Sequence, residues 1–160
     1  MITGSFQGGD RLVERIRNMP AAVRRALLEA VKRLTIELQA YVMESKLSGQ
    51  VLHNRTGTLR RSIYQHLLES VTGVLGEVGT NLGYGVFWEY GGTIPAHDVV
   101  AKGRALAFTW NGNQVFFKRV HIPERHEAER SFLRTALADQ ASYIRETIIA
   151  AVRSAVRNTR

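Results

Sequence analysis

The chain has 160 residues, 44% of them hydrophobic, and no cysteine. This length and apolar content predict one compact domain with its own core. The lack of cysteine excludes disulfides, thiolate nucleophiles and cysteine-ligated metal sites. An excess of 22 Lys and Arg over 14 Asp and Glu gives a formal charge of +8, which attracts nucleic acid, anionic membranes or acidic protein surfaces without choosing among them.

The beginning of the chain carries no recognisable targeting signal. Residues 1–10 lack the basic start and apolar stretch of a secretory signal. No apolar run approaches the roughly 20 residues needed to span a bilayer. We therefore expect a protein made in a cytoplasm, with no membrane partner.

The N-terminal third is predicted to be helical. Glycines dilute residues 1–9, which predicts a flexible lead, and Asp10 can cap a short helix over residues 10–17. Proline at position 20 breaks that helix and suits the start of another. Apolar residues then recur at spacings of three and four, which predicts an amphipathic helix up to about residue 47. They are Val23, Leu27, Val31, Leu34 and Leu38.

Residues 48–122 are predicted to form loops and two β-hairpins. Apolar and β-branched runs at 63–67 and 74–78 flank a turn at Gly73, and runs at 105–110 and 115–120 flank an Asn111-Gly112 pair. Residues 81–90 fit a short helix or an irregular turn, with Gly91 as a stop. Residues 93–104 lack any clear period and are predicted to be a loop. Four strands in two hairpins can form one antiparallel sheet.

The helical period returns after Pro123. Segment 123–157 is predicted to hold a long amphipathic helix from about His126 to Arg157, followed by a tail at 158–160. The expected apolar stripe is Leu133, Leu137, Ala141, Ile144, Ile148, Val152 and Val156. The fold class is therefore α+β over residues 1–160: a small antiparallel sheet of about four strands packed with a long N-terminal and a long C-terminal amphipathic helix.

Catalytic and metal-binding patterns fail in detail. The pair His126-Glu127 begins a zinc-protease motif, but Arg130 stands where the second histidine ligand is required. The five histidines are scattered, and the chain has no G-x-S-x-G elbow. We expect no catalytic residues, no metal and no cofactor, and hence a protein that is not an enzyme.

Two segments carry the strongest family signal. The first is L-x-x-R-T-G-x-L-R-x-S-I, from Leu52 to Ile63, and the second is Y-x-x-x-x-E-Y-G-G, from Tyr84 to Gly92. Ile122-Pro123 leads, through a longer charged spacer than usual, into Phe132-Leu133. Together these segments resemble the tail-completion or neck proteins at the head-to-tail junction of long-tailed bacteriophages.

This resemblance implies a virion structural protein, assembled in the host cytoplasm and located at the head-tail junction. Its subunits would form a ring, with six as the expected number. The ring would join the head-side connector or stopper to the tail-side terminator or tube, and DNA would pass through its lumen without specific binding. Two alternatives stay open: a tail terminator that caps the tube, and a basic nucleic-acid-binding module whose affinity falls steeply with salt.

The same segments supply the candidate interface residues. Arginines near Gly57 can clamp carboxylates of a neighbouring subunit, or they can face water beside a capped turn. The aromatic cluster is expected to anchor the core or a subunit contact, and Glu89 within it is expected to pair with an arginine of the first motif. The candidates are Arg55, Thr56, Arg60, Arg61, Phe87, Trp88, Glu89, Tyr90, Lys102 and Arg104.

Overall fold

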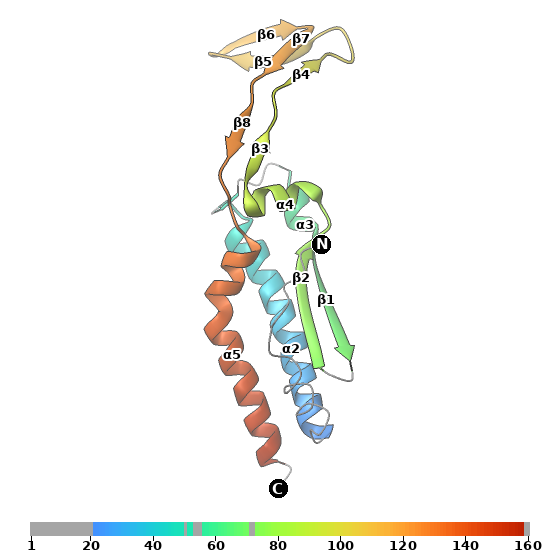
Figure 1. Ribbon diagram of the computed structural model, residues 1–160, viewed down its shortest axis with the longest axis vertical. Coiled ribbons are helices and arrows are strands. Elements are labelled where there is room, and N and C mark those ends of the chain that lie inside the picture. Colours follow the sequence, from blue (N-terminus) through green and yellow to red (C-terminus); the bar gives the residue numbers. More distant parts are fainter. Residues whose placement is uncertain (1–20, 50, 53–55, 71–72, 159–160) are drawn as a thin grey trace.

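The computed structural model describes residues 21–49, 51–52, 56–70 and 73–158. Figure 1 shows an elongated molecule, with a helical body at one end and a thin β-stranded arm at the other. The predicted lead at 1–9 and the predicted short helix at 10–17 lie outside the described residues.

The described chain mixes helices and strands, which confirms the α+β class. The helical elements are α2 (Ala21–Tyr41), the π-helical turn η1 (Val42–Lys46), α3 (Thr58–Arg61), α4 (Gly83–Tyr90) and α5 (Leu133–Arg157). The strands are β1 (Ile63–Ser70), β2 (Gly73–Thr80), β3 (Gly92–Ile94), β4 (His97–Val100), β5 (Leu106–Trp110), β6 (Asn113–Phe117), β7 (Arg119–Ile122) and β8 (Arg125–Glu127).

The body has three layers. Helix α2 lies between α5 on one side and the β1–β2 hairpin on the other (Figure 1). The hairpin approaches α2 closely at Gly76, where a Cβ atom would overlap the Thr35 hydroxyl. A side chain at position 76 would therefore push the hairpin off the helix.

The strands do not form the single sheet expected from the sequence. They form four separate antiparallel pairs: β1–β2, β3–β8, β4–β7 and β5–β6. Both predicted hairpins exist, and Asn111 and Gly112 adopt the positive φ angles of 48° and 81° that the second turn requires. However, only β1–β2 lies against the helices, whereas the other three pairs build the arm (Figure 1).

Two element boundaries predicted from the sequence are wrong. The expected loop at 93–104 contains β4 and most of β3, because these residues pair with β7 and β8. The last helix begins at Leu133 and not near His126, since residues 125–127 are held in strand β8. The residues predicted to begin this helix are therefore part of the arm.

The core of the body lies where α2, η1 and the start of α5 meet. Its buried members are Val42, Leu47, Leu52, Ile63, Phe132 and Ala136. The apolar stripe predicted for the last helix is only partly correct, because Leu137 and Val156 are exposed, while the buried residues of α5 are Ala136 and Ala155. Small alanine side chains allow a neighbouring backbone to come close.

No helix in the described part of the chain is both long enough and apolar enough to cross a membrane.

Candidate functional site: a pocket at the base of the arm

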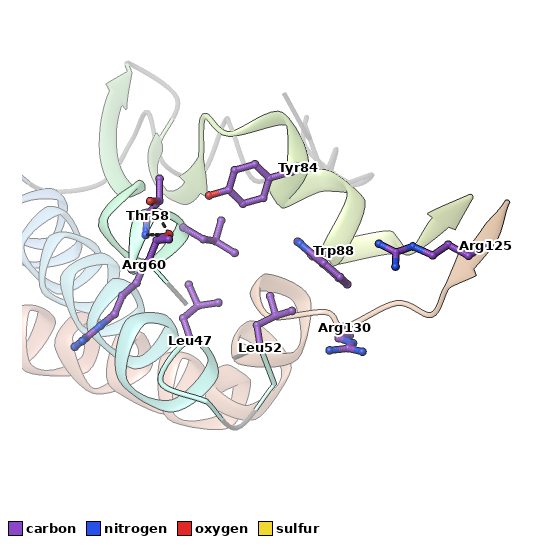
Figure 2. A pocket seen from close by; sticks show the side chains of 11 residues that line it. Leu47, Leu52, Thr58, Arg60, Tyr84, Trp88, Arg125 and Arg130 are labelled. Atoms are coloured by element: carbon purple, nitrogen blue, oxygen red, sulfur yellow. Dashed lines mark hydrogen bonds between the residues drawn. The ribbon is translucent and has the colours of Figure 1, made fainter. Parts of the chain in front are cut away.

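The two sequence motifs meet at the base of the arm. A cavity of about 590 Å³ opens between the turn at 56–60, helix α4 and strand β8. Three leucines form its apolar part, and the turn, two aromatic rings and the end of the arm form the rest (Figure 2). The lining residues are Leu47, Leu52, Thr56, Gly57, Thr58, Leu59, Arg60, Tyr84, Trp88, Arg125 and Arg130.

Hydrogen bonds within the chain hold the turn at 56–60, which forms one wall of the cavity. Gly57 has a φ of 70°, a left-handed conformation that glycine adopts without strain. Arg61 donates a hydrogen bond from its guanidinium to the carbonyl of Thr56 (3.0 Å). The hydroxyls of Thr56 and Thr58 lie 2.9 Å apart. This arrangement agrees with a capped turn and occupies Arg61 within its own chain.

Arg60 lines the cavity, but its guanidinium is directed away from Tyr84 and Trp88 (Figure 2). Its Nε atom is buried and has no hydrogen-bond partner among the described residues. Arg55, the remaining arginine of the first motif considered for a clamp, lies outside the described residues.

Trp88 separates the apolar part of the cavity from its basic end. The indole packs against the core cluster, and the ring of Phe87 meets it edge-on at a centroid distance of 5.4 Å. The guanidinium of Arg130 lies 5.3 Å from the centroid of the Trp88 ring, at cation–π distance. Arg125 lies at the same end and pairs with Glu127 (Nε to Oε1, 3.4 Å) (Figure 2).

Glu89 follows Trp88 in helix α4 and is almost completely buried, with 1% exposure. Its carboxylate accepts hydrogen bonds from the backbone N–H groups of Phe132 (2.8 Å), Leu133 (2.9 Å) and Arg134 (2.9 Å), and from the hydroxyl of Ser131 (2.7 Å). These N–H groups open α5 and have no partner within the helix. Glu89 therefore caps α5 and ties it to α4.

The pairing expected for Glu89 from the sequence is not made by Arg60 or Arg61, the two arginines of the first motif that the structure describes. The cationic partner is Arg134, whose Nε lies 3.2 Å from Oε1, and not an arginine described in the first motif. The Arg134 guanidinium also stacks over the ring of Tyr90 at 4.6 Å. The physical reason is topological, because the arm returns the chain to α4 just where α5 begins.

Opposing influences set the ionisation of Glu89. Burial alone would raise the pKa of this carboxyl, but the hydrogen bonds from Leu133, Ser131, Arg134 and Phe132 together outweigh it. The pKa of Glu89 is therefore held below its ordinary value, and the carboxylate stays charged.

The structure divides the predicted site residues into groups. Thr56, Arg60 and Trp88 line the pocket, and Phe87 supports Trp88. Glu89 and Tyr90 contact the start of α5, and we call these contacts the clasp. Lys102 and Arg104 are exposed between β4 and β5, near the far end of the arm (Figure 1).

Several residues of the site were not predicted. Tyr84 stands at the start of the second motif, so the motif itself could have indicated it. Arg125 and Arg130 lie in the charged spacer, where no local pattern distinguishes them. Ser131 and Arg134 flank the Phe132-Leu133 pair and belong with it to the family resemblance, but they were not among the candidate interface residues. Across the residues that the structure describes, no three His, Asp or Glu side chains gather as a metal site would require.

Comparisons with protein-family models, with curated proteins and with solved structures return no match for this chain.

The pocket combines an apolar wall with a cation. Its leucine and aromatic walls can bury an apolar group, and the guanidinium of Arg130 has no carboxylate partner among the described residues, although it lies on Trp88. Guanidinium groups bind carboxylates through charge-assisted hydrogen bonds. An apolar side chain next to an acidic one fits both ends.

Proposed function

We propose that this chain is a structural protein of the phage head-to-tail junction, a tail-completion or neck protein that acts by binding alone. Six copies form a ring between the head-side connector or stopper and the tail-side terminator or tube. DNA passes through the lumen without specific contacts. The protein has no catalytic activity.

The observation that carries this proposal is the arm. Residues 92–127 leave the helical body as paired strands (Figure 1). The outer strands bear large apolar side chains that are exposed. Trp110 is 65% exposed and Phe116 is 63% exposed. Exposed apolar surface of this kind marks a protein–protein contact site.

A ring makes efficient use of such an arm. When each subunit places one surface on a different surface of the next copy, the contacts are heterologous, and the arrangement closes if the rotation between copies permits. Each contact can be weak, because a closed ring repeats the same contact between every pair of neighbouring subunits. The basic pocket at the base of the arm supplies a second surface for an acidic segment of a neighbour or a junction partner.

The decisive experiment is deletion of the gene from a phage that encodes this chain. We expect filled heads and complete tails that fail to join, with joining restored by the protein supplied from a plasmid. Electron microscopy of the lysate distinguishes the outcomes. Tails of uncontrolled length would favour a tail terminator, and normal infectious particles would contradict both structural roles.

A further inference from the structure

The outer part of the arm bears an apolar groove of about 660 Å³ between its two strand pairs. The register of β5 and β6 places Leu106, Phe108 and Trp110 on one face, opposite Phe117 and Val115. Phe108 and Phe117 stack with ring centroids 5.8 Å apart. Val99, Val120 and Ile122 from β4–β7 complete the groove.

A second apolar surface lies on the body, on the outer face of the β1–β2 hairpin. Leu67 and Gly76 pair on the face that approaches α2, so Leu68 and Leu75 pair on the opposite face. These two leucines are 48% and 57% exposed. They form an apolar ridge, continued along the same face by Tyr64.

The two surfaces have opposite charge. The segment from His97 to Ile122 carries Lys102, Arg104, Lys118 and Arg119 against a single carboxylate, Asp98. That carboxylate is already bound within the arm, by Arg119 and by His121. The outer arm therefore carries an excess of positive charge, and Arg119 lines its apolar groove.

The β1–β2 hairpin is the acidic counterpart. Its described residues include no Lys or Arg, unlike helices α2 and α5, in which cations outnumber carboxylates. Of its two carboxylates, Glu69 faces α2 and pairs with Arg24, so Glu77 is the carboxylate of the outer face. Glu77 stands opposite His66 on the outer face, next to the leucine ridge. An apolar ridge beside a carboxylate complements an apolar groove beside cations.

We propose that the arm groove of one copy packs on the outer face of the β1–β2 hairpin of a second copy. The arm projects from the end of the body, away from its own hairpin (Figure 1), so a neighbouring copy supplies the ridge. Leu68 and Leu75 enter the groove, and Lys118 lies near Glu77. This contact rests on the proposed function, for which it supplies the interface between ring subunits.

The test uses single cysteines, since the chain has none of its own. Asn113→Cys lies on the groove face of β6, directly opposite Trp110, and Gln114→Cys lies one residue further on the other face. His66→Cys lies on the outer face of β1–β2. Mixing the Asn113→Cys and His66→Cys proteins under mild oxidation should give a mixed disulfide, identified by mass spectrometry, whereas the matched Gln114→Cys protein should give at least about tenfold less.

Charge reversal provides an independent measurement. Lys118→Glu places a carboxylate near Glu77 of the next copy and should weaken self-association by about tenfold, because like charges across an interface repel. Glu77→Lys in the same chain should restore it. Analytical ultracentrifugation measures the association, and circular dichroism checks that each variant folds.

The outcomes separate this contact from the proposed function. Rings without the Asn113–His66 disulfide would overturn the contact and leave the junction role standing, while disulfide-linked dimers that never close would support the contact and count against the ring. A protein that remains monomeric at about 100 µM would overturn the contact. So would arm-dependent binding to anionic phosphatidylserine vesicles in place of self-association.

Discussion

The Oε2 atom of Glu89 lies 2.8 Å from the backbone nitrogen of Phe132, and both residues are almost wholly buried. The two residues are 43 positions apart, and the whole arm lies between them in the sequence. This hydrogen bond, with its neighbours at Leu133 and Arg134, closes the base of the arm. The arm therefore leaves from and returns to one fixed point of the body.

Replacing Glu89 by glutamine should reduce the stability of the fold. The amide cannot match the negative charge at the start of α5, and its NH₂ group faces N–H donors. We expect the free energy of unfolding to fall by about 3 kcal/mol, measured by urea denaturation. Glu129→Gln removes an exposed partner of the same Arg134 and should cost no more than about 0.5 kcal/mol; equal losses in the two variants would contradict the clasp.

The same carboxylate predicts a dependence of stability on pH. The folded pKa of Glu89 lies below its ordinary value of 4.5, so its contribution is complete above that value. The contribution is lost as the pH falls through the folded pKa. Unfolding measured from pH 7 down to pH 3 should show a decline that is shallower in Glu89→Gln. Parallel profiles for the two proteins would show that other carboxylates cause the decline.

Gly76→Ala should separate the β1–β2 hairpin from α2. The new methyl group would overlap the hydroxyl of Thr35, which is buried against the hairpin. Overpacking of this kind costs about 1–3 kcal/mol, and Thr35→Ala in the same chain should recover much of it. Gly103→Ala is the matched control, because a Cβ there meets open space. Thermal unfolding of the four proteins provides the comparison.

The two long helices and the two hairpins could be predicted because their signals are local. The apolar spacing from Val23 to Leu38 needs only the 3.6-residue period, and Asn111-Gly112 needs only the turn it forms. Gly91, with a φ of 71°, ends α4 where a glycine stop was expected. Each of these elements is specified by residues within a few positions of one another.

The arm and the clasp could not be predicted in the same way. Thr93 pairs with His126 across 33 positions, and the residues around neither of them have a local pattern that indicates a strand. Glu89 could be recognised as a carboxylate that needs a partner, because it stands among large rings. Which arginine it meets depends on where the arm returns the chain, and that is decided by long-range strand pairing.

The two tryptophans should respond differently to truncation. Trp88 packs on the core, so Trp88→Ala should lower the free energy of unfolding by about 3 kcal/mol. Trp110 is 65% exposed at the arm, so Trp110→Ala should leave stability within about 0.5 kcal/mol and weaken self-association. Denaturation together with sedimentation separates the two effects. A destabilised Trp110→Ala protein would place that ring in the fold and not in the interface.

The positive charge of the chain provides the last prediction, because a channel for DNA and a dedicated DNA binder use cations differently. A binder needs many phosphate contacts, and each adds roughly 0.9 to the slope of log affinity against log salt. In the described structure, several cations already bind carboxylates of their own chain: Arg24 pairs with Glu69, Lys46 with Asp139 and Arg134 with Glu89.

We therefore expect weak binding to duplex DNA, blind to sequence and lost near 150 mM salt, while self-association persists because apolar contacts carry it. Fluorescence anisotropy with two labelled duplexes of different sequence, at about 50 and 150 mM salt, measures the binding. Nanomolar affinity at the higher salt would sink the junction role in favour of a nucleic-acid-binding module. Lys118→Glu provides the control, because it should weaken self-association. The loss of one phosphate contact would change the salt slope of DNA binding by only about 0.9.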